Sequence, residues 1–173
     1  MVSVSDARVL AFIIAGTGAV IDIRTRRIPN ALTFGAAAIS FFFSFLTGGW
    51  HAFGQSLAGW AIGVGLFLPI YVLGGMGAGD VKLLGAVGAW LGPLGAIRSG
   101  LFSVLAGGLL ALVVSIRHRY LGTAFRNLWG LLLFWRVAGV RPLPGLSIQE
   151  SRGPKLAYGV AIAAGTAVAV FFP

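Results

Sequence analysis

Long apolar stretches separated by short polar or glycine-rich connectors run through most of the chain. Between Ile28 and Gly79 no residue is charged, and this stretch is long enough for two membrane-spanning helices with a turn between them. Glycines at 48–49 and 74–79 and the Gly-Pro pair at 92–93 interrupt the apolar pattern, as turn residues do. The pattern therefore predicts six membrane-spanning helices, near residues 9–23, 31–46, 55–73, 80–91, 99–116 and 156–172.

The segment between the last two of these helices follows a different pattern. Its middle is apolar but is bracketed by Arg126 and Arg136, and the interval between them is too short to cross a bilayer. Large apolar side chains repeat there at helical spacing: Phe125, Leu128, Trp129, Leu132 and Trp135. We therefore expect an amphipathic helix over 125–137 that lies on the membrane surface, followed by a loop at 141–145.

Composition agrees with a protein that lies in lipid. Of the 173 residues, 58% are hydrophobic and only 10% are charged, whereas soluble domains are about a quarter charged. The expected fold class is an all-α integral membrane protein, with residues 1–173 forming a single domain. The 27 glycines are best explained by close packing of helices through small residues.

Composition also restricts the chemistry. The absence of cysteine excludes disulfides and thiolate zinc sites, and two histidines far apart in the sequence disfavour a histidine metal site. We therefore expect no metal and no cofactor.

The basic residues are distributed unequally between the two sides of this topology. Eleven of the thirteen lie in the connectors that alternation places on one side, and only Arg8 and Arg98 lie on the other. The positive-inside rule puts the richer side in the cytoplasm, with both termini outside. Membrane topology thus accounts for the net charge of +9, and we expect lipids rather than nucleic acid as partners.

Two of the four carboxylates, Asp22 and Asp80, lie at the edges of apolar helices, whereas Asp6 and Glu150 lie in polar segments. Ionisable groups at membrane depth are costly and are often functional. Asp22 ends the first predicted span and Asp80 begins the fourth, so both lie at the cytoplasmic edge. Two facing carboxylates that share a proton can form an aspartic protease site. Alternatively, Asp22 pairs with a nearby arginine and Asp80 simply caps its helix.

Two motifs contain these aspartates. Asp22 is followed by Ile28-Pro29-Asn30, and Asp80 ends the run Gly77-Ala78-Gly79-Asp80. Together they resemble the two aspartate motifs of the type IV prepilin peptidase family, and residues 156–165 resemble its closing segment. The resemblance implies an aspartic endopeptidase in the bacterial inner membrane that cleaves the leader peptide of prepilins or pseudopilins at the cytoplasmic face, in type IV pilus assembly or type II secretion. Asp22 and Asp80 would be its catalytic residues.

The neighbouring motif residues have supporting roles in this interpretation. Gly77 and Gly79 would let an extended substrate backbone approach Asp80. Pro29 and Asn30 would end the first helix and cap the second. Lys82, two positions after Asp80, would extend to lipid headgroups.

Many family members carry a cysteine-rich cytoplasmic insertion and methylate the new N-terminus. This chain has no cysteine and no such insertion, and so resembles the short, peptidase-only branch that serves Flp-type pili. Two other classes of function stay open at this point: a transporter in which the aspartates relay protons or cations, and a non-catalytic subunit of a pilus or secretion assembly.

Overall fold

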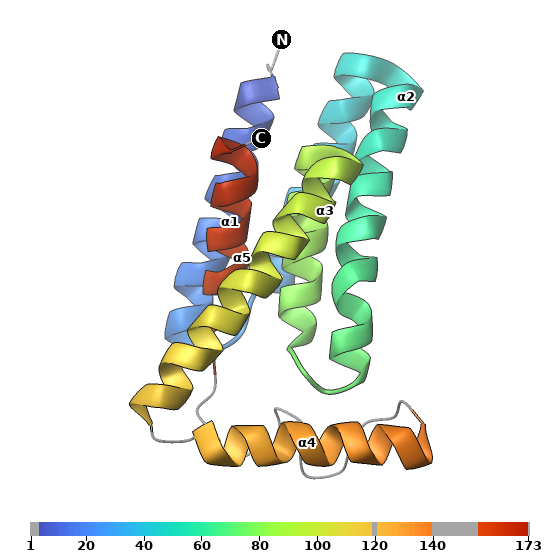
Figure 1. The fold of residues 1–173 in the computed structure, drawn as a ribbon. Coiled ribbons are helices and arrows are strands. Elements are labelled where there is room, and N and C mark those ends of the chain that lie inside the picture. Colours follow the sequence, from blue (N-terminus) through green and yellow to red (C-terminus); the bar gives the residue numbers. More distant parts are fainter. Residues whose placement is uncertain (1–3, 119–120, 140–155, 173) are drawn as a thin grey trace.

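A computed structural model describes residues 4–118, 121–139 and 156–172, and helix is the only regular secondary structure in these ranges (Figure 1). The helices are α1 (Val4–Thr25), α2 (Asn30–Val72), α3 (Ala78–Arg117), α4 (Leu121–Ala138) and α5 (Tyr158–Phe171). The expected all-helical fold is therefore confirmed for this part of the chain. The loop predicted at 141–145, and Glu150, lie outside the described residues.

Helices α2 and α3 each consist of two limbs. Gly49 in α2 has φ +61° and Gly92 in α3 has φ +71°, and neither residue is helical. A side chain would be strained at these angles, so glycine permits each reversal. The limbs, 30–48 and 50–72 in α2 and 78–91 and 93–117 in α3, correspond to the second to fifth predicted spans. The predicted turns at 48–49 and 92–93 are confirmed.

The limbs, α1 and α5 form an upright bundle, and both termini lie at one end of it (Figure 1). The connectors from α1 to α2 and from α2 to α3 lie at the other end, where α4 runs crosswise. This arrangement brings the aspartate motifs to one end of the bundle. It also confirms a helix where the amphipathic segment was predicted.

Glycine allows the closest helix contacts, as expected. A Cβ on Gly59 would collide with the carbonyl oxygen of Gly88, and one on Gly63 would collide with the backbone of Leu84. The second limb of α2 and the first limb of α3 therefore touch backbone to backbone. A close fit of this kind compensates for the weak hydrophobic drive between helices in lipid.

The described residues have an apolar core that includes Phe67, Leu83 and Leu84, but their outer surface is also largely apolar. Several hydroxyl side chains are buried: Thr33, Ser40, Ser56, Ser99, Ser103 and Thr166. Phe42, Leu105 and Leu109 are instead more than 60% exposed, as are other large apolar residues. Both α2 and α3 are long and apolar enough to cross a membrane. These features indicate membrane association.

Candidate active site

Asp22 lies in the last turn of α1, whose end is sharply defined. The N–H of Arg26 donates to the carbonyl of Asp22 (2.9 Å), and Arg26 has φ +55°. A residue in this left-handed conformation is a common way to end a helix. The hydroxyl of Thr25 donates to the carbonyl of Ile21 (3.0 Å) and accepts from the N–H of Arg27 (3.3 Å), which fixes the turn that follows.

The start of α2 differs from the prediction that Asn30 caps it. Pro29 is the N-cap, and no side chain donates or accepts a capping hydrogen bond there. The amide oxygen of Asn30 instead accepts from Nζ of Lys82 (2.9 Å), and Nζ also lies 5.2 Å from the centre of the Phe34 ring. Lys82 therefore joins α3 to the start of α2. This contact was not predicted from the sequence, which favoured extension of Lys82 to lipid headgroups.

The connector from α2 to α3 positions Asp80. Gly74 has φ +78°; its N–H donates to the carbonyl of Tyr71, and that of Gly75 donates to the carbonyl of Ile70, which ends α2 in a Schellman motif. The next helix begins after Gly77, its N-cap.

Asp80 is therefore the third residue of α3 and not its N-cap residue, although its side chain takes part in the cap. Its Oδ2 accepts from the N–H of Gly77 at 3.2 Å. The side chain thus forms the returning half of a capping box, which fixes its orientation at the helix start.

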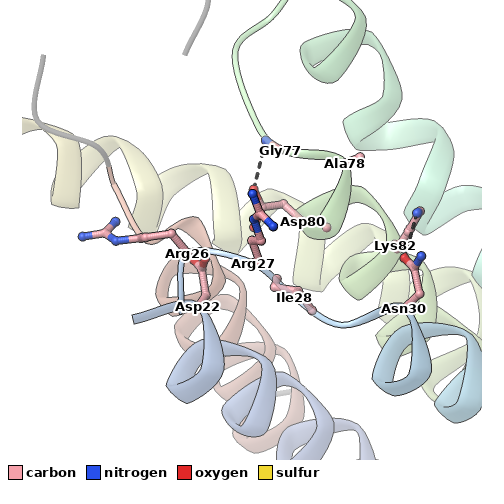
Figure 2. A pocket seen from close by; sticks show the side chains of 10 residues that line it. Asp22, Arg26, Arg27, Ile28, Asn30, Gly77, Ala78, Asp80 and Lys82 are labelled. Carbon is pink, nitrogen blue, oxygen red and sulfur yellow. Dashed lines mark hydrogen bonds between the residues drawn. The ribbon is translucent and has the colours of Figure 1, made fainter. Parts of the chain in front are cut away.

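The two aspartates line the same pocket, of about 330 Å³ (Figure 2). Asp22 is only 7% exposed and Asp80 only 8%. Figure 2 shows the two side chains approaching the pocket from the end of α1 and the start of α3. The other lining residues are Arg26, Arg27, Ile28, Asn30, Gly77, Ala78, Gly79 and Lys82. Residues 58 positions apart in the sequence thus contribute to one cavity, and every predicted site residue except Pro29 lines it.

The two motif glycines have different surroundings. A Cβ on Gly79 would lie 3.1 Å from Cβ of Ile28, so this glycine permits close packing of α3 against the connector that follows α1. A Cβ on Gly77 would lie 3.2 Å from Oδ2 of Asp80. The missing side chain at Gly77 therefore leaves room for the catalytic candidate itself.

One contact of the site was not predicted. The N–H of Gly159, at the start of α5, donates to Oδ2 of Asp22 at 3.1 Å. Gly159 is buried and lies 137 positions from Asp22 in the sequence. Its only signal in the sequence was its place in the segment 156–165, to which no role in the site was assigned.

The arrangement suits chemistry between two carboxyl groups. Each aspartate is held through one oxygen by a backbone N–H, and both lie in a cavity large enough to hold several water molecules. Among the residues that the structure describes, no three His, Asp or Glu side chains gather as a metal site requires. Two buried acids in one cavity can divide the roles of base and acid between them.

Comparison with known families identifies the chain. A family model described as the type IV leader peptidase family matches residues 9–116, more than half of the protein. The chain belongs to the type IV leader peptidase family. This membership indicates a membrane-associated peptidase whose substrates are in general of the prepilin type. No curated protein and no solved structure gives a significant match.

The matched region of this leader peptidase contains most of α1, all of α2 and nearly all of α3. Asp22, Asp80 and every other residue that lines the pocket lie within it. Helix α5 lies outside the match, although Gly159 contacts Asp22 directly.

Proposed function

We propose that the protein is an aspartic endopeptidase in which Asp22 and Asp80 are the two catalytic carboxyl groups. The observation that supports this most strongly is the meeting of both residues, each more than nine-tenths buried, in one pocket of a leader peptidase. An ionisable group at the edge of an apolar helix costs free energy, and acids found at such positions are often functional. A shared catalytic site would account for both aspartates.

The proposed reaction is hydrolysis of a peptide bond by water held between the carboxyl groups. The ionised carboxylate takes a proton as the water oxygen bonds to the scissile carbonyl carbon, and the protonated carboxyl group hydrogen-bonds to the carbonyl oxygen. The proton of this second carboxyl group then passes to the amine nitrogen as the C–N bond breaks. The backbone N–H groups of Gly77 and Gly159 hold the two carboxyl groups during these steps.

We propose that the substrates are Flp-type prepilins, with the pocket at the cytoplasmic face of the inner membrane. The connector with Arg26 and Arg27 lines the pocket, and the positive-inside rule places such basic connectors in the cytoplasm. With its six predicted spans, the enzyme would be multi-pass and in contact with lipid. Gly77 is exposed at the pocket, and its lack of a side chain leaves space for an extended peptide.

Coexpression with a Flp-type pilin precursor tests this function. The wild-type protein should shorten the precursor by its leader, as measured by the mass of the intact pilin. Asp22→Asn and Asp80→Asn should each leave it uncut, because asparagine keeps the shape of the side chain but removes the acid. Asp6→Asn makes the same chemical change outside the pocket and should cleave normally.

Two results would reject the proposal. Appreciable cleavage by either active-site variant would exclude the aspartic mechanism. An uncut precursor with wild-type protein that is correctly inserted would instead favour a transporter or an assembly subunit.

A further inference from the structure

The start of α5 lies against the end of α1 at the catalytic candidate. The N–H of Gly159 donates to Oδ2 of Asp22 at 3.1 Å, and both residues are buried. Because buried polar groups keep their hydrogen-bond partners, this amide can fix where the carboxyl group lies. Gly159 itself does not line the pocket, so it acts on the site through Asp22.

Only glycine fits at this position without movement. A Cβ on residue 159 would lie 3.1 Å from Cβ of Asp22, 3.2 Å from its Oδ2 and 3.2 Å from Cα of Ala19. Ordinary Cβ contacts are 3.4–4 Å. A methyl group would therefore push the end of α1 and its carboxyl group away from α5, while the N–H itself would remain.

The preceding residue fixes α5 to the helices around it. The ring of Tyr158 contacts that of Phe67 edge to face, with centroids 5.7 Å apart, and its hydroxyl donates to the carbonyl of Ser103 at 3.4 Å. The ring also fills the space beside Gly107, where a Cβ would lie 2.6 Å from Cε2. Tyr158 thus sets the position of the Gly159 amide relative to α2 and α3, and α3 carries Asp80.

We propose that Gly159 is a positioning residue for Asp22, and that Tyr158 anchors it. Helix α5, which lies outside the matched family region, would then complete the active site. The Tyr158-Gly159 pair would hold the carboxyl group from α1 at a fixed place relative to the one from α3. This inference rests on the proposed function for its catalytic consequence, but the contact itself can be tested without cleavage.

The first test is Gly159→Ala, with Gly16→Ala as the control. Gly16 is also in a helix, and a Cβ there meets nothing within 4 Å. With a purified precursor peptide, we expect Gly159→Ala to lower kcat about tenfold with little change in KM, because the substrate pocket is not blocked. We expect Gly16→Ala to match the wild type.

An infrared measurement separates positioning from a general loss of fold. The carboxyl bands of Asp22 are assigned from the difference between wild type and Asp22→Asn. They should shift in Gly159→Ala and not in Gly16→Ala. Wild-type kcat together with unshifted bands in a folded Gly159→Ala protein would overturn the proposal. If the wild type does not cleave at all, the proposed function fails, whereas the bands still report on the Gly159 contact.

A second pair of variants moves Tyr158 without altering α5. Gly107→Ala places a methyl group against the Tyr158 ring, and Gly108→Ala places one in open space on the same helix. Gly107→Ala should lower kcat and shift the same Asp22 bands, and Gly108→Ala should do neither. This pair also decides the question if Gly159→Ala does not fold. Equal kcat and equal bands in the two variants would remove Tyr158 from the proposal.

Discussion

The contact between Gly79 and Ile28 gives the sharpest prediction about how the site is built. Gly79→Ala would place a Cβ 3.1 Å from Cβ of Ile28, where ordinary contacts are 3.4–4 Å. The connector that leads from α1 must therefore move away from α3. Since Asp22 lies just before this connector and Asp80 follows Gly79 directly, the two carboxyl groups should separate.

The size of the effect follows from these distances. The separation must increase from 3.1 to at least 3.4 Å, which is a shift of a few tenths of an ångström. A misplacement of about 1 Å can cost about a hundredfold in rate, so a shift of this size should lower kcat about fourfold. Overpacking of this kind also costs about 1–3 kcal/mol of folding free energy.

A double-mutant cycle with Ile28→Gly tests the cause. Without the Ile28 side chain, the nearest of the contacted atoms is the Ile28 backbone nitrogen at 3.5 Å, which is an ordinary contact. Gly79→Ala should therefore reduce kcat much less in the Ile28→Gly background than in the wild type. The assay is cleavage of a purified precursor by enzyme in detergent, with Gly65→Ala as the control because a Cβ there meets nothing within 4 Å.

An equal loss of kcat in both backgrounds would refute this reasoning. It would show that the methyl group acts on something other than Ile28. The remaining explanation would be that Gly79 leaves space for the substrate backbone. The KM of Gly79→Ala should then be higher than that of the wild type.

Three further predictions concern the whole protein. Reporters fused after Arg27 or near Gly145 should be cytoplasmic and those at Gly49 or the C-terminus external; an internal C-terminus would show that the number of spans is wrong. Pilin matured by the purified protein alone should carry an unmethylated N-terminus, and a methyl group found there by mass spectrometry would contradict this expectation. Gly59→Ala should lower the apparent melting temperature in detergent strongly, because its Cβ would collide with Gly88, whereas Gly65→Ala should not; equal melting temperatures would contradict the packing.

Much of the fold could be predicted because the signals are local. Apolar run length and glycine position predicted the limbs of α2 and α3, and the spacing of apolar residues predicted α4. Successive helices were expected to run in opposite directions, and this predicted that Asp22 and Asp80 lie at the same end of the bundle. The first two inferences depend on residue types within a short stretch of sequence, and the third adds only a count of successive spans.

The contact that holds the carboxyl group of Asp22 could not be predicted in the same way. Asp22 and Asp80 each accept a hydrogen bond from a backbone N–H, a group that almost every residue carries. For Asp80 that amide belongs to Gly77, three positions earlier, and the contact is local. For Asp22 it belongs to Gly159, 137 positions away, so packing between helices decides which amide lies close enough. Lys82 illustrates the same limit, since its bond to Asn30 joins residues 52 positions apart.

The central claim is that Asp22 and Asp80 act as one catalytic unit. The most direct test compares single-turnover cleavage by Asp22→Asn, Asp80→Asn and the double variant, with the rate above the uncatalysed reaction measured for each. Groups that act as a unit are strongly non-additive, so the double variant should be no slower than the slower single variant. Losses that multiply in the double variant would show that the two aspartates act independently, and would contradict the account.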